Sequence, residues 1–198
     1  MGTRSTGNRH FGHIWLRPQL LFLAVVSATA GWSHATSVRA LEIDEVVRAS
    51  DQIFLGRLVA VGEGRVPGMD LPYTEYRFAV AEWIKGGTGQ TVSIRQMGTL
   101  GRAPLLAGLP SYRKGQEIVL CLYKPSRVGL TSPVGMQQGY YPVERDAGGE
   151  RFVRLGVMSG SVARLRAGLK GAATGAGEPQ VVDRVLLDEF LSLLRAVR

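Results

Sequence analysis

Residues 117–124 read EIVLCLYK, and no charged side chain interrupts the run from Ile118 to Tyr123. A short continuous apolar run is typical of a strand that is covered on both faces, whereas a half-exposed strand alternates apolar and polar residues. The segment therefore predicts a central strand in a fold that is mainly β.

Further strand patterns lie on both sides of this segment. Apolar and β-branched residues fill 53–61, alternate with charged residues in 74–84 and recur in 91–96. Two shorter candidates, 139–144 and 151–157, flank the turn sequence DAGG at 146–149. These patterns predict one β domain over residues 36–165.

Two helices are expected at the ends of this domain. Residues 41–50 place Ile43, Val46 and Val47 at helical spacing, with acidic residues early in the segment. At the other end, a small-residue linker is expected over 166–178, followed by an amphipathic helix over 179–198 that starts at Pro179. Its apolar stripe either packs on the sheet or docks on a partner or membrane. The stripe consists of Val182, Val185, Leu186, Phe190, Leu193, Leu194 and Val197.

The N-terminal segment 1–35 is typical of a secretory signal peptide. Arg4, Arg9 and Arg17 precede the apolar run LLFLAVVSATA at 20–30, and no acidic residue occurs before Glu42. The run falls short of the roughly 20 apolar residues that a spanning helix needs, so a transmembrane anchor is the less favoured alternative. Cleavage after Ala35 is expected, with sites after residues 30 and 40 as alternatives. The mature protein would then be secreted or periplasmic.

Removal of this segment also removes His10, His13 and His34, which are all the histidines of the chain. The mature protein would lack the commonest general base and metal ligand. Cys121 is the only cysteine, so no intramolecular disulfide can form. The sequence predicts a domain without cofactor or metal that is stabilised by its hydrophobic core.

Positive charge is concentrated in the middle of the chain. The full sequence carries +8, and loss of the three arginines in the leader leaves +5. Residues 83–143 hold seven basic residues and one acidic residue, and the connection 97–115 is long and free of acid. Apolar side chains beside arginines are typical of interfaces, which predicts an acidic secreted or envelope partner rather than nucleic acid. The alternative is that the leucines of this loop cap one end of the β domain while its charges face water.

The predicted partner-binding residues come from this connection and from the strand at 139–144. They are Arg102, Leu105, Leu106, Tyr112, Arg113, Lys114, Tyr140 and Tyr141. For the two adjacent tyrosines the alternative is a place in the core, where strand aromatics usually lie.

One pattern points to catalysis. Ser111 and Lys114 match S-x-x-K, the nucleophile motif of penicillin-binding serine enzymes, but the partner motifs S-D-N and K-T-G are absent. In those enzymes the motif begins a helix, whereas here it leads into the strand at 117–124. Cys121, set among apolar residues, is expected to be a buried and inert thiol. The sequence therefore does not favour an enzyme.

The segments 49–61, 73–86, 89–98, 108–123 and 135–143 together resemble a group of exported bacterial proteins. Their strand order is similar to the OB-like module of netrins and tissue inhibitors of metalloproteases. The resemblance implies a small OB-like barrel with a short N-terminal helix and a C-terminal amphipathic helix. In the metalloprotease inhibitors an N-terminal cysteine chelates the zinc of the target, and this chain has no cysteine there. We expect an exported non-enzymatic binding module, with a secreted serine hydrolase or a structural envelope component as alternatives.

Overall fold

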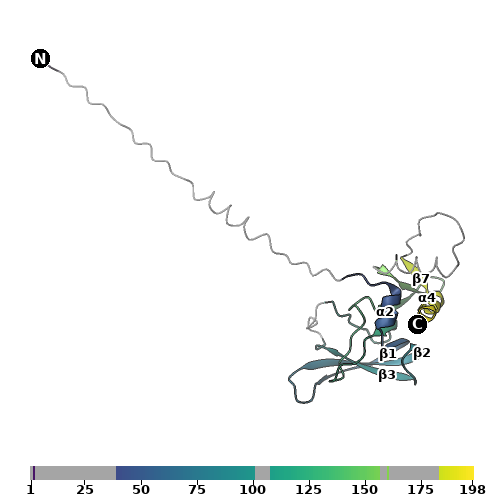
Figure 1. Cartoon of the computed structure of the whole chain (residues 1–198), viewed down its shortest axis with the longest axis horizontal. Helices are drawn as coiled ribbons and strands as arrows, with labels where there is room; N and C mark the ends of the chain where they lie inside the picture. Colours follow the sequence, from purple (N-terminus) through teal and green to yellow (C-terminus); the bar gives the residue numbers. More distant parts are fainter. Residues whose placement is uncertain (1, 3–38, 101–107, 157–159, 161–182) are drawn as a thin grey trace. The chain divides into compact units, whose positions relative to one another are not determined.

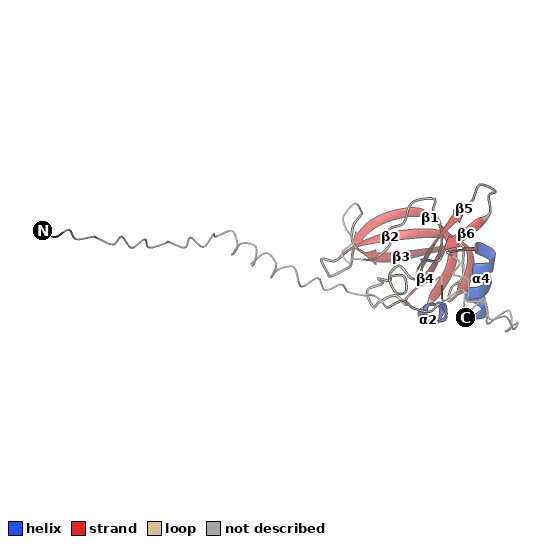
Figure 2. Cartoon of the chain, turned by 90° about the horizontal axis from the view of Figure 1, so that it is seen from above, coloured by secondary structure: helices blue, strands red, loops and turns tan. Residues whose placement is uncertain are grey.

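The computed structural model describes residues 2, 39–100, 108–156, 160 and 183–198 of the chain. Except for residue 2, these belong to one compact unit, Val38–Arg198. Seven antiparallel strands form a single sheet in the order β3-β2-β1-β4-β5-β6-β7. Figures 1 and 2 show the strands together with helices α2 and α4. None of the helices in the described ranges is long and apolar enough to cross a membrane. The strands are β1 (Gln52–Arg65), β2 (Pro72–Lys85), β3 (Thr91–Met97), β4 (Glu117–Leu122), β5 (Tyr140–Arg145), β6 (Arg151–Arg154) and β7 (Arg184–Leu186), and the helices are α2 (Ile43–Ala49) and α4 (Leu187–Ala196).

Strand β4 is the middle strand of the sheet, as its apolar run predicts. Every residue from Ile118 to Leu122 is fully buried. Side chains alternate across a strand, so Val119 and Cys121 enter one hydrophobic cluster while Ile118, Leu120 and Leu122 enter another. The sheet therefore separates two cores, and β4 contributes to both.

Helices α2 and α4 both contribute to the first of these cores. Val46 and Val47 of α2 and Phe190 and Leu194 of α4 are fully buried in it. Polar contacts hold both helices to β2 at the edges of the cluster. The Lys85 ammonium donates to the Val47 carbonyl at 2.8 Å, and the Arg195 Nε donates to Glu82 at 3.1 Å.

The second core is formed by side chains of β1–β4 on the other face of the sheet. Figure 2 shows that β1 and β2 are curved. Strand β1 has three register shifts against β2, and such bulges bend and twist a strand. The segment before β4 contributes Tyr112, whose ring packs edge-on against Tyr76 at 4.6 Å and Phe78 at 5.7 Å between centroids. This core is therefore aromatic, while the helix-covered core is mostly aliphatic.

The predicted fold class is confirmed in part: the domain is mainly β, but its strands form an open sheet, with β3 at one edge and β7 at the other, rather than a closed barrel. Beyond β4 the chain adds β5, β6 and β7 outward, and none of these strands returns to β3. A short loop reaches that edge, where Thr131 donates its N–H to the Arg95 carbonyl at 2.8 Å. The same loop contacts the end of β4, since the Tyr123 N–H donates to Ser132 at 3.1 Å.

The predicted strands and the short helix at 41–50 are present with shifted ends, but the C-terminal element differs. The expected helix over 179–198 begins only at Leu187, because residues 184–186 pair with β6 as β7. Val185 lies opposite Val153 and is buried, while Arg184 and Leu186 face outward. The predicted linker 166–178 and the positions of Pro179 and Val182 lie outside the described residues.

Candidate functional site

A pocket of about 490 Å³ lies where β5 begins and β6 ends. Its wall combines apolar groups such as Met136 and Leu155 with the polar side chains of Gln137 and Arg154. Tyr140 and Tyr141, two of the predicted binding residues, also line it, and Gly108 borders it from the long connection 97–115. A pocket of this size and character suits an apolar group bound by a few polar contacts.

The turn before β5 shapes this pocket with an unusual backbone. Gly135 and Met136 have φ of 59° and 63°, and Met136 is the one non-glycine residue with positive φ among those described. The Gln138 side chain holds the turn against the segment before α2, since its Oε1 accepts from the Leu41 N–H at 2.6 Å. A non-glycine residue in the left-handed region is uncommon and has an energetic cost, which the contacts of this turn must offset.

The two adjacent tyrosines face opposite cores, as neighbours in a strand must. Tyr141 is buried against Phe190, so it contributes to the core rather than to an exposed surface. Burial raises the pKa of its hydroxyl well above the usual value, and the oxygen has no hydrogen-bond partner among the described residues. The Tyr140 hydroxyl is partly buried and accepts from Gln116 at 2.9 Å.

The remaining predicted residues fall into three groups. Arg102, Leu105 and Leu106 lie outside the described residues. Tyr112 is buried in the aromatic core, which raises the pKa of its hydroxyl well above the usual value and removes the residue from the predicted surface. Arg113 and Lys114 are exposed.

Arg113 and Lys114 occupy a tight turn that is fixed to β1. The Gln116 N–H donates to the Arg113 carbonyl at 2.9 Å, and Gly115 closes the turn with φ of 83°. The Gly115 N–H donates to the Leu58 carbonyl at 2.8 Å, and its own carbonyl accepts from Arg57 Nη1 at 2.9 Å. The two cations are therefore presented from a rigid position beside Arg57.

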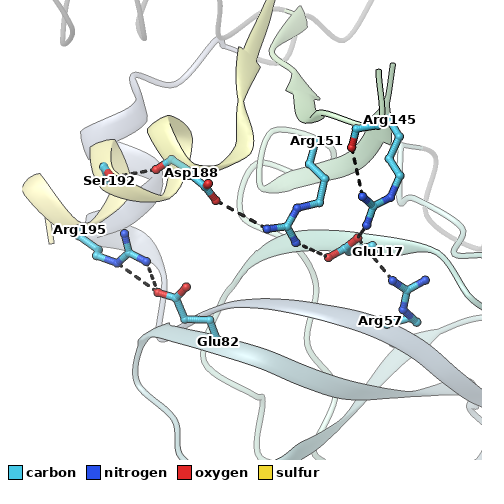
Figure 3. Close-up of polar contacts among 9 residues, drawn as sticks. Arg57, Glu82, Glu117, Arg145, Arg151, Asp188, Ser192 and Arg195 are labelled. Carbon is cyan, nitrogen blue, oxygen red and sulfur yellow. Dashed lines mark hydrogen bonds and ion pairs between the residues drawn. The ribbon is translucent and has the colours of Figure 1, made fainter. Parts of the chain in front are cut away.

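Three further arginines, which the sequence did not single out, meet at Glu117 (Figure 3). Its carboxylate lies 3.5 Å from Arg57, 3.5 Å from Arg145 and 3.2 Å from Arg151, which come from β1, β5 and β6. The Glu117 side chain is only 12% exposed, whereas those of Arg57, Arg145 and Arg151 are 53%, 55% and 36% exposed. The guanidinium groups thus cover the carboxylate and face solvent. We call the surface formed by Arg57, Arg113, Lys114, Arg145 and Arg151 the basic end.

Cross-strand pairing explains this convergence. Arg57 lies directly opposite Glu117 in the β1–β4 pair, and Arg145 lies opposite Arg151 in the β5–β6 pair. In the sequence these residues are spread over nearly 100 positions, so no local pattern could reveal them. Only Glu117 carried a sequence-level clue, as the sole acidic residue in the basic block 83–143.

The structure describes Ser111, Lys114 and Cys121, the residues whose types the sequence raised for catalysis. Ser111 and Lys114 lie in the loop before β4 and not at the start of a helix. Cys121 is fully buried, and burial raises the pKa of its thiol to about 12, which keeps it protonated at neutral pH. The described ranges contain no group of three or more His, Cys, Asp and Glu residues that could hold a metal ion.

Comparison with known families and proteins adds no assignment. No protein-family model matches the chain, and a search of curated proteins finds no match either. The class that the structure itself defines is a mainly β domain with an open seven-stranded sheet and two helices.

Proposed function

We propose that the protein is an exported, non-enzymatic binding module that binds an acidic protein partner at its basic end. The observation that carries this proposal is the convergence of Arg57, Arg145 and Arg151 over one nearly buried carboxylate, beside the fixed turn of Arg113 and Lys114. Arginine fits carboxylates with two parallel hydrogen bonds, and it is enriched at protein interfaces. Export rests on the leader-like segment 1–35.

The pocket is a separate place where a partner could make contact. Arg151 of the basic end and Arg154 of the pocket wall are both in β6, but they are three residues apart, so their side chains lie on opposite faces of the strand. The basic end alone therefore carries the proposal, and the pocket offers room for an apolar group beside Met136. Interfaces commonly combine a buried apolar anchor with a charged rim.

We also propose that the fold is related to the OB-like module of netrins and metalloprotease inhibitors. The OB-fold is itself a partly open barrel, which an open sheet with a curved β1–β4 part resembles. The loop that contacts both β3 and the end of β4 supports this relation, because it lies where a barrel would close. A wide, solvent-filled space between β3 and the end of β4 in a crystal structure would argue against this relation.

The binding proposal is tested by capture from the periplasmic or secreted fraction with the mature protein as bait. Arg113→Glu with Lys114→Glu should abolish capture of the acidic partner, while the melting temperature stays nearly unchanged because exposed charges contribute little to stability. Lys124→Glu with Arg127→Glu is the matched control. It makes the same charge change on exposed residues in the loop after β4, whereas the basic end lies where β4 begins. If both double variants capture the same proteins as the parent, Arg113 and Lys114 do not bind the partner, which contradicts the proposal that the basic end acts as one surface.

A further inference from the structure

The arrangement around Glu117 is more specific than a basic surface, because one carboxylate fixes three guanidinium groups from one side. Each of the three arginines also makes a second contact within the protein, in addition to its contact with Glu117. Arg57 Nη1 donates to the Gly115 carbonyl at 2.9 Å and Arg145 Nη1 to the Gly149 carbonyl at 3.3 Å, while Arg151 Nη2 lies 3.7 Å from Asp188. A guanidinium has five N–H donors, so each retains donors beyond these contacts.

Fixing these side chains in advance changes the cost of binding. A free arginine side chain has rotamer entropy, which is lost when a ligand holds the side chain in one position. Here Glu117 and the two backbone carbonyls already restrict the three arginines, and their side chains are still 36–55% exposed. A preorganised site binds with a smaller entropic loss than a flexible one.

The charges of the neighbourhood favour an anion. Three guanidinium groups face two carboxylates in contact with them, Glu117 and Asp188, which leaves a net charge of +1. Asp146 in the adjacent turn is directed to its own backbone, where it accepts from the N–H groups of Gly148 and Glu150. The Glu150 carboxylate is exposed in the same turn and is the acid that opposes an incoming anion. The fixed turn of Arg113 and Lys114 adds two cations beside Arg57.

We propose that Arg57, Arg145 and Arg151 form a receptor for a tetrahedral oxyanion, a phosphate group, which sits over Glu117 on the solvent side. Arginine pairs with phosphate through two parallel hydrogen bonds, and three converging guanidinium groups offer more donors than one carboxylate can accept. The inference goes beyond the proposed function, because it names a small anionic group and requires no protein partner. Free phosphate and a phosphate-bearing lipid headgroup share this chemistry.

The test follows the side-chain Nε–H signals of the arginines by NMR while inorganic phosphate replaces chloride at constant ionic strength. We expect saturable shifts for Arg57, Arg145 and Arg151 and none for Arg127, an exposed arginine in the loop after β4. Arg145→Gln should weaken phosphate binding by about tenfold or more, because it removes a charged hydrogen-bond donor. Arg127→Gln removes the same charge and should change the affinity less than about twofold, as expected for a distant screened charge. Absence of saturable shifts, or equal weakening by both variants, contradicts the inference.

A vesicle-binding experiment distinguishes free phosphate from a phosphate-bearing lipid headgroup. Phosphatidylcholine vesicles containing phosphatidic acid are compared with pure phosphatidylcholine vesicles in a sedimentation assay. Retention by the phosphatidic acid vesicles that Arg145→Gln removes supports a lipid headgroup, and phosphate binding without retention supports a soluble phosphate. Binding of neither contradicts the inference. The proposed function would still stand if the protein partner were captured through Arg113 and Lys114, so the two can fail separately.

Discussion

The ring of Tyr141 in β5 packs on the ring of Phe190 in α4, with centroids 4.7 Å apart and planes at 59°. This contact joins the C-terminal helix to the middle of the sheet, since Tyr141 pairs directly with Val119 of β4. Both aromatic residues are buried, and the hydroxyl of Tyr141 lacks a partner among the described residues. Burial of the two rings therefore stabilises this contact, whereas burial of the unpaired Tyr141 hydroxyl opposes it.

Phe190→Ala is expected to lower the free energy of unfolding by about 3–5 kcal/mol, the usual cost of emptying a buried phenylalanine site. Leu186→Ala is the control, because this leucine is 49% exposed and should change stability by less than about 0.5 kcal/mol. Urea unfolding followed by the fluorescence of Trp83 measures both. Equal effects of the two variants would show that α4 is not packed on the sheet in solution.

Tyr141→Phe is expected to leave the free energy of unfolding unchanged or to raise it. The substitution keeps the ring against Phe190 and removes a buried oxygen that has no described partner. An unpaired buried hydroxyl typically costs about 1–3 kcal/mol of desolvation. A clear loss of stability in the same urea experiment would mean that the hydroxyl is satisfied, for example by an ordered water.

Glu117→Gln is expected to destabilise the protein by about 1–3 kcal/mol, because three arginines lose the charge that opposes their mutual repulsion. Glu144→Gln breaks the exposed pair with Arg154 and should cost at most about 1 kcal/mol. Added salt should reduce the difference between the two variants by screening the arginines. If Glu117→Gln is as stable as Glu144→Gln at low salt, the cluster contributes nothing to the fold.

Cys121 is expected to resist thiol reagents in the folded protein at pH 8 and to react fully in urea. Burial raises the pKa of this thiol from 9.0 to about 12, so the folded protein keeps the proton that the unfolded chain loses. Stability is therefore unaffected below pH 9 and is lost as the pH rises from about 9 toward 12. Val59→Cys in a Cys121→Ala background provides a partly exposed thiol as the reactive control. Rapid labelling of native Cys121 would contradict its burial.

The mature protein is expected to begin at Thr36, because the leader-like segment 1–35 ends in small residues suited to cleavage. Intact-mass measurement on protein recovered from the periplasm or medium tests this directly. Replacing Ala35 with a bulky residue should shift or slow the cleavage. Full-length chain in the membrane fraction, with Met1 retained, would contradict both cleavage and export.

Local pattern alone predicted much of the fold. The apolar run from Ile118 to Tyr123 identified the central strand, because its character follows from side-chain alternation across two covered faces. The helical spacing of Ile43, Val46 and Val47 located α2 for a similarly local reason. Only the ends of these elements shifted, since they depend on hydrogen bonds to other segments.

The C-terminal helix shows where local pattern was insufficient. Its apolar stripe fitted a helix from Pro179 onward, but Val185 lies beside β6 and pairs with Val153, so residues 184–186 are a strand. Strand pairing requires a partner that is distant in the sequence, and propensity in the segment itself does not contain that information. The sheet is open rather than a barrel for the same reason: which strands pair at the edges is not encoded in any single segment.

The candidate site was likewise predictable from the sequence only in part. The sequence determined that Arg113 and Lys114 lie in an acid-free connection before the central strand, because charge and turn residues are local properties. Only the tertiary structure decided that Arg57, Arg145 and Arg151 meet at Glu117. Their meeting depends on the register of two strand pairs and on β4 lying between β1 and β5, and register is fixed by burial on both faces of the sheet rather than by any neighbouring residue.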